Sequence, residues 1–139
     1  MTYLLDTVTV SELRKPAARA DPGVVAWAAA QNPLELYLSV ITILEIELGI
    51  IRKEQADPVQ GVVLRRWLEH DVLPAFDDRI LPVDLVIARA TASLHVPDPR
   101  PERDAMIAAT AFVHGHTVVT RNLSDFAPTG VKLLNPWAS

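Results

Sequence analysis

The chain has 139 residues, a net charge of −4, 50% hydrophobic residues and no cysteine. This length fits one compact domain, and the hydrophobic content argues against a disordered chain. Without cysteine, disulfides, thiolate nucleophiles and zinc–thiolate clusters are excluded, so any metal ion must be bound by oxygen atoms or histidine. The acidic balance excludes a broadly basic surface for duplex DNA, but it is compatible with carboxylates that hold a divalent cation.

The sequence predicts a single domain over residues 1–139. It contains no repeats, no low-complexity tract and no linker. No apolar run approaches the roughly 20 residues that a membrane-spanning helix needs. The first residues also lack a basic and apolar leader, so we expect no membrane association and a location in the cytoplasm.

Predicted strands and helices alternate along the chain. Short apolar runs that end at polar or turn residues predict strands, and capping residues followed by apolar stretches predict helices. The proline-rich residues 96–101 predict an exposed loop. In chain order we expect a strand at 3–5, a helix at 24–30, a strand at 36–39, helices at 42–51 and 58–73, a strand at 80–83, helices at 85–90 and 103–113, and strands at 117–120 and 131–134.

This alternation predicts an α/β fold whose central sheet is mainly parallel, with helices on both faces. Parallel strands need long crossover connections, which helices commonly supply. Ligands of such sheets bind beyond the carboxyl ends of the strands. We therefore searched these ends for residues with chemical functions.

Four carboxylates follow predicted strands or begin a predicted helix. They are Asp6, Glu45, Asp104 and Asp125. Acids that converge from separate loops suit Mg²⁺ or Mn²⁺, which prefer oxygen ligands. A metal ion of this kind activates water for attack on a phosphodiester. Capping of a helix by Asp6 and a favourable dipole position for Asp104 are the structural alternatives.

Glu45 is the acid for which function is the stronger interpretation. Its neighbours Ile43, Leu44 and Ile46 predict a mostly buried helix, where a lone carboxylate is costly without a cation or hydrogen bonds. Glu47 lies on the same helix but points about 200° away, which favours a solvated or ion-paired side chain.

Four segments of the chain resemble the successive motifs of PIN-domain ribonucleases, most of all the VapC-type toxins of bacterial toxin–antitoxin pairs. They are residues 4–7, 39–49, 104–111 and 120–126. Residues 80–82 and 135–137 are similar to the FitB-like branch of this family. The resemblance extends from Leu4 to Trp137 and implies a PIN-like fold for the whole chain.

The resemblance implies an endoribonuclease that depends on Mg²⁺ or Mn²⁺ and cleaves RNA with metal-activated water. Asp6, Glu45, Asp104 and Asp125 match the acidic residues of the family as catalytic and metal-binding residues. Supporting positions are matched by Thr7 and Asn122, and Arg121 is placed to touch a phosphate. The implied partners are an RNA substrate, a small VapB-like antitoxin and a second copy of the chain in a homodimer.

Three alternatives stay open at this point. Val8 stands where this branch usually has asparagine, which motivates a catalytically silent binding module on the same fold. A phosphoreceiver would need paired acids after the first strand and a lysine after the last, whereas Lys132 lies on the wrong side of its strand. Acid–base cleavage by His114 and His116 is the third alternative, although both flank Gly115 in a turn where exposed histidines are common.

Overall fold

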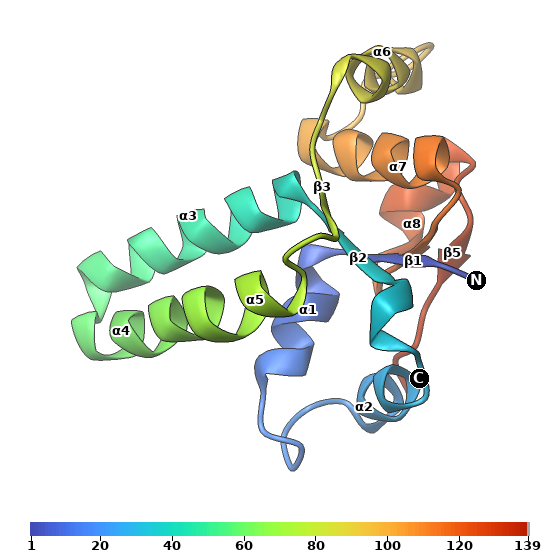
Figure 1. Ribbon diagram of the computed structural model, residues 1–139. Coiled ribbons are helices and arrows are strands. Elements are labelled where there is room, and N and C mark those ends of the chain that lie inside the picture. The colour runs from blue at the N-terminus through green and yellow to red at the C-terminus, as the bar shows by residue number, and fades with distance from the viewer. Residues whose placement is uncertain (139) are drawn as a thin grey trace.

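The computed structural model describes residues 1–138 (Figure 1). Its strands are β1 (Tyr3–Leu5), β2 (Leu36–Ser39), β3 (Ile80–Leu81), β4 (Thr117–Val119) and β5 (Leu133–Leu134). Its α-helices are α1 (Thr7–Arg14), α2 (Pro22–Ala29), α3 (Val40–Ala56), α4 (Pro58–Arg66), α5 (Leu73–Ala75), α6 (Leu85–Leu94), α7 (Glu102–His114) and α8 (Leu123–Phe126). A π-helical segment, Trp67–Val72, joins α4 to α5, and short 3₁₀ helices lie at Pro33–Glu35 and Ala127–Thr129.

The five strands form one parallel sheet in the order β3-β2-β1-β4-β5. Tyr3 of β1 is in register with Leu36 of β2 on one side and with Thr117 of β4 on the other. The predicted α/β fold with a mainly parallel sheet is therefore confirmed. Because all strands run in the same direction, the carboxyl ends of β1, β2 and β4 meet at one edge of the sheet.

Helices cover both faces of the sheet, as predicted. Leu4 and Leu5 are fully buried and enter two different apolar clusters, because successive strand residues point to opposite faces. The Leu5 cluster includes residues of α1, α3 and the π-helical segment. The Leu4 cluster includes residues of α7 and α8, and α6 packs against α7 on the outside (Figure 1).

Helix α1 is the main element that the strand and helix pattern did not predict. The pattern indicated a polar turn after residue 5, but the capping role considered for Asp6 is confirmed, because Asp6 accepts a hydrogen bond from the backbone N–H of Thr9 and caps a helix over Thr7–Arg14. The β-branched, alternating residues 7–10 resemble a strand more than a helix. The N-cap and the packing of Val10 against the sheet outweigh that local preference.

The long helices α3 and α4 form an antiparallel hairpin that projects from the sheet (Figure 1). Gly61 of α4 is buried where the two helices approach each other. A Cβ atom at this position would lie 2.7 Å from the Cα atom of Glu54 in α3. The hairpin therefore requires the absence of a side chain at residue 61. None of the helices within residues 1–138 is long and apolar enough to cross a membrane.

The two helical glycines of this hairpin predict opposite effects of the same substitution. Gly61→Ala should lower the free energy of unfolding by about 1–3 kcal/mol, because the new methyl group overlaps the backbone of α3. Gly49→Ala should raise it by up to about 1 kcal/mol, because nothing lies within 4 Å of the added Cβ atom and alanine favours the helix. Urea unfolding of both variants checks this pair, and equal effects of the two substitutions would contradict it.

Candidate active site

Asp6 lies directly after β1 at the edge where the strands end. Its side chain is buried, with 4% exposure. The carboxylate accepts hydrogen bonds from the backbone N–H of Thr9 at 2.9 Å and from the Thr9 hydroxyl at 2.7 Å. Burial raises the pKa of Asp6, although hydrogen bonds from Thr120 and Thr9 oppose this increase. Asp6 is thus both the N-cap of α1 and a partly desolvated acid.

Glu45 of α3 lies beside Asp6 at the same edge. The Thr7 hydroxyl donates a hydrogen bond of 2.6 Å to Oε1 of Glu45, and Nη1 of Arg103 lies 3.8 Å from Oε2. The side chain of Glu45 is 26% exposed, so the carboxylate faces a solvent-accessible site rather than the interior. The hydroxyl of Thr7 orients it, and Arg103 balances its charge in part.

Asp104 lies in the first turn of α7, and Asp125 lies in the first turn of α8. Burial raises the pKa of Asp104, and the negative charges of Asp125, Glu45 and Asp6 raise it further, in that order. These three carboxylates are therefore near enough to Asp104 to act on it through their charge. The structure places all four acids that the sequence singled out at this end of the sheet, while their catalytic and metal-binding roles stay predictions.

The donor set fits a hard divalent cation in its chemistry. All four side chains offer carboxylate oxygens, and their mutual repulsion is relieved by a positive charge. Within residues 1–138, however, no three Asp, Glu or His side chains are grouped closely enough to form a finished metal site. Mg²⁺ commonly keeps several water molecules and binds one or two carboxylates directly, so a partly open set of acids suits it.

The predicted supporting residues have different positions. Thr7 bonds to Glu45, whereas Asn122 is exposed and supplies only its backbone, with its N–H bonded to the Thr120 hydroxyl. The guanidinium of Arg121, which we expect to touch a phosphate, lies 5.9 Å from the centre of the Trp137 ring. This contact with Trp137 was not predicted. The sequence analysis missed Thr9 and Arg103. Thr9 could have been found because it lies three positions after the capping residue Asp6, and Arg103 because it directly precedes Asp104.

The histidine prediction was wrong in one respect. His114 is exposed as expected, but His116 is buried, because its Nδ1 lies 2.6 Å from the Thr2 hydroxyl and its ring stacks on Tyr37. Burial lowers the pKa of His116, and the neighbouring His114 lowers it further. Outside the acid site, Glu47 forms an ion pair with Arg65, in agreement with its predicted orientation.

The raised pKa of Asp104 predicts how stability depends on pH. Because folding raises this pKa above the ordinary aspartate value of 3.8, the stabilising contribution is complete below pH 3.8 and is lost as the pH rises through the folded-state pKa. Asp104→Asn cannot ionise and should increase the Tm at pH 7 in metal-free buffer. The increase should shrink as the pH falls towards 4, and a difference that is independent of pH would contradict this assignment.

Comparison with known proteins agrees with the geometry. The PIN domain family model matches residues 3–129. The chain is 38% identical to the VapC ribonuclease Y4jK of Sinorhizobium fredii, with 96% of each chain covered. It is 36% identical to the toxin FitB of Neisseria gonorrhoeae over 96% of this chain and 97% of that protein. The crystal structure of FitAcB from N. gonorrhoeae has a TM-score of 0.89 and 34% identity, covering 99% of this chain and all of the other. The chain therefore belongs to the PIN-domain family, as a homologue of VapC and FitB.

Proposed function

We propose that this protein is a metal-dependent endoribonuclease and the toxin of a VapBC-type toxin–antitoxin pair. The observation that carries the proposal is the placement of four carboxylates at the carboxyl edge of the sheet, directly after β1, in the helices that follow β2 and β4, and in the first turn of α7. Relatives with a similar length are named a VapC ribonuclease and a toxin, which supports RNA as the substrate.

The residues of the site have separable tasks in this proposal. Asp6, Glu45, Asp104 and Asp125 would hold Mg²⁺ or Mn²⁺. When bound, such a cation supplies positive charge to the scissile phosphate and acidifies a water molecule for attack on phosphorus. Thr7 keeps one oxygen of Glu45 fixed through its 2.6 Å hydrogen bond. Thr9 holds Asp6 in one rotamer, so that the carboxylates meet the substrate without reorganisation.

Two glutamates of α3 provide a matched test. Glu45→Gln should lower Mg²⁺-dependent cleavage of a single-stranded RNA by at least roughly 100-fold, because it removes a charge from the proposed metal site. Glu47→Gln, only two residues away, should keep cleavage within about twofold, because Glu47 bonds to Arg65 on another face of the helix. The measurement is the single-turnover rate of purified, antitoxin-free protein.

The fold must be preserved in these experiments. Asp6→Ala would remove the N-cap of α1 and cost about 1 kcal/mol, so Asp6→Asn is the better variant because an amide oxygen still accepts from Thr9. Equal cleavage by the parent, Glu45→Gln and Asp6→Asn would refute the proposed site. Circular dichroism of every variant separates loss of activity from loss of structure.

Val8 motivates a second candidate function, a silent binding module on the same fold. Its side chain is 41% exposed and offers no hydrogen bond. In this structure the side-chain donors to Asp6 come from Thr9 and Thr120, which favours an active site despite valine at residue 8. Metal-dependent cleavage by the parent decides between the two functions, because a silent module would bind RNA or protein without cleaving RNA.

The proposed partners include a small VapB-like antitoxin. The support comes from the relatives, since one is named the toxin FitB and another is a FitAcB crystal structure. An antitoxin that brings a basic side chain to the four carboxylates would compete with the metal ion and with the RNA.

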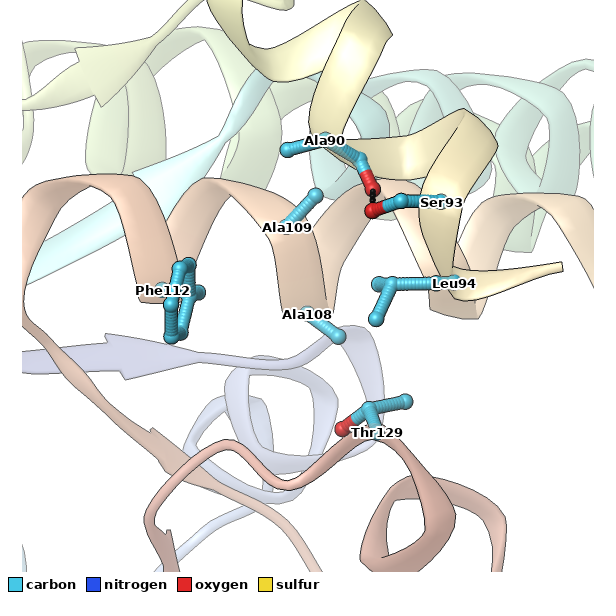
Figure 2. Close-up of a pocket in the computed structure, with 7 residues that line it drawn as sticks. All are labelled: Ala90, Ser93, Leu94, Ala108, Ala109, Phe112 and Thr129. Atoms are coloured by element: carbon cyan, nitrogen blue, oxygen red, sulfur yellow. Dashed lines mark hydrogen bonds between the residues drawn. The ribbon is translucent and has the colours of Figure 1, made fainter. Parts of the chain in front are cut away.

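The second proposed partner is another copy of the chain. Leu85 and Val86 of α6 and Phe112 of α7 are large apolar residues with 75%, 58% and 72% exposure. Phe112 also borders a hollow of about 170 Å³ between α6, α7 and Thr129, with mainly apolar side chains facing it (Figure 2). Apolar surface of this kind on a small protein is typical of an interface between subunits.

This proposal predicts a dimer that one substitution disrupts. Phe112→Glu should give a monomer, because two copies would have to bury the new charge. Val59→Glu at the equally exposed start of α4 should leave the dimer intact. Sedimentation velocity measures both variants and the parent, and a parent that is monomeric at every concentration would contradict the proposal.

A further inference from the structure

A groove leads away from the acid site between α1, α3 and α4. Thr7 and Glu45 lie at its near end, and its wall includes Ile46, Ile50 and Trp67. The groove has a volume of about 260 Å³ and is continuous with the proposed active site, because Thr7 and Glu45 belong to both. When the scissile bond of a polymer lies at the carboxylates, the adjoining part of the polymer can lie in this groove.

Two cations line this groove. Arg14 is the last residue of α1, and Lys53 lies in the last turn of α3. Both helices carry an acid-site residue in their earlier part, so each has an acidic end at the site and a cation further away. Lys53 follows Glu45 by eight residues, or about 12 Å along the helix.

Neither cation is neutralised by the protein. Among residues 1–138, no carboxylate oxygen lies within 4.0 Å of the charged nitrogens of Arg14 or Lys53. Two nearby cations differ in this respect, because Lys15 pairs with Glu12 and Arg65 pairs with Glu47 and Glu54, whereas Arg52 is unpaired within residues 1–138 as well but does not line the groove. Two unpaired cations that line one groove indicate an anionic ligand.

We propose that Arg14 and Lys53 bind backbone phosphates of the RNA strand next to the scissile phosphate and thereby hold the strand in this groove. This inference rests on the proposed function. A groove lined by a carboxylate of the site and by two unpaired cations matches a strand whose reacting phosphate arrives with a metal ion and whose next phosphates have none. Trp67 supplies an apolar wall for the bases. An adjoining hollow that Arg14 shares with Asp71 is less suitable for a phosphate, because Asp71 repels it.

RNA affinity and its salt dependence test the proposal. A labelled single-stranded RNA is titrated with Asp104→Asn protein in Mg²⁺ buffer, so that binding is observed without cleavage. Adding Arg14→Ala or Lys53→Ala should weaken binding roughly three- to tenfold and flatten the plot of log K against log salt by about 0.7 each. Arg14→Lys and Lys53→Arg should restore most of the slope.

The matched control is Arg52→Ala, which removes a neighbouring exposed cation that does not line the groove. It should leave the affinity and the salt slope unchanged. In the cleaving protein, Arg14→Ala and Lys53→Ala should raise KM and leave kcat within about twofold.

Affinity and slope that are unchanged in both alanine variants would overturn the proposal, as would an equal loss from Arg52→Ala. Loss of antitoxin binding alone, with RNA affinity unchanged, would also overturn it and assign the groove to the protein partner. RNA binding that depends on Arg14 and Lys53 in a parent that never cleaves would instead refute the proposed activity and leave the RNA-binding groove standing.

Discussion

Parallel pairing of β1 between β2 and β4 is the constraint on which the acid site depends. It places three strand ends at one edge, and the chain turns into a helix or loop directly after each of them. Asp6 follows β1 at once, Glu45 lies in the helix that follows β2, and Asp125 lies in the helix that follows β4. Asp6 and Asp125, which are 119 positions apart in the sequence, thus lie at the same edge of the sheet.

The main cost of this arrangement is electrostatic. Burial raises the pKa values of Asp6 and Asp104, and neighbouring carboxylates raise them further, so ionised acids at this site are costly without a cation. Threonine hydroxyls at residues 7 and 9 orient the acids without neutralising them, and Arg103 is 3.8 Å from only one of them. Neutral donors therefore fix the geometry and leave the charge available for an external cation.

Sequence patterns predicted those features that depend on local interactions. Asp21 and Asp84 cap α2 and α6, the helices expected near residues 24–30 and 85–90, and the fully buried runs around Leu4 and Val118 form central strands. Tertiary interactions decided the rest. Residues 7–10 form a helix because Asp6 caps it and Val10 packs in the core, while the sequence pattern favoured a turn.

The same distinction between local and tertiary interactions applies to the candidate site. The four acids were identified from their places after strands and from family motifs, and their proximity needs only the parallel sheet. The contacts of individual side chains were not accessible in this way. His116 was expected in solvent but is buried against Tyr37, and the position of Arg121 over Trp137 was not expected. Such contacts join residues far apart in the chain, for which hydrophobic periodicity carries no information.

The double role of Asp6 restricts how this protein can lose its activity during evolution. A substitution at residue 6 that removes the side-chain acceptor also removes the N-cap hydrogen bond from the Thr9 backbone, so natural selection acts on folding and chemistry together. Glu45 and Asp104 accept no helix-capping hydrogen bond within residues 1–138. Inactive descendants of this chain are therefore expected to keep a capping residue at position 6, either Asp or a replacement by Asn, Ser or Thr. Residues 45 and 104 are free to diverge.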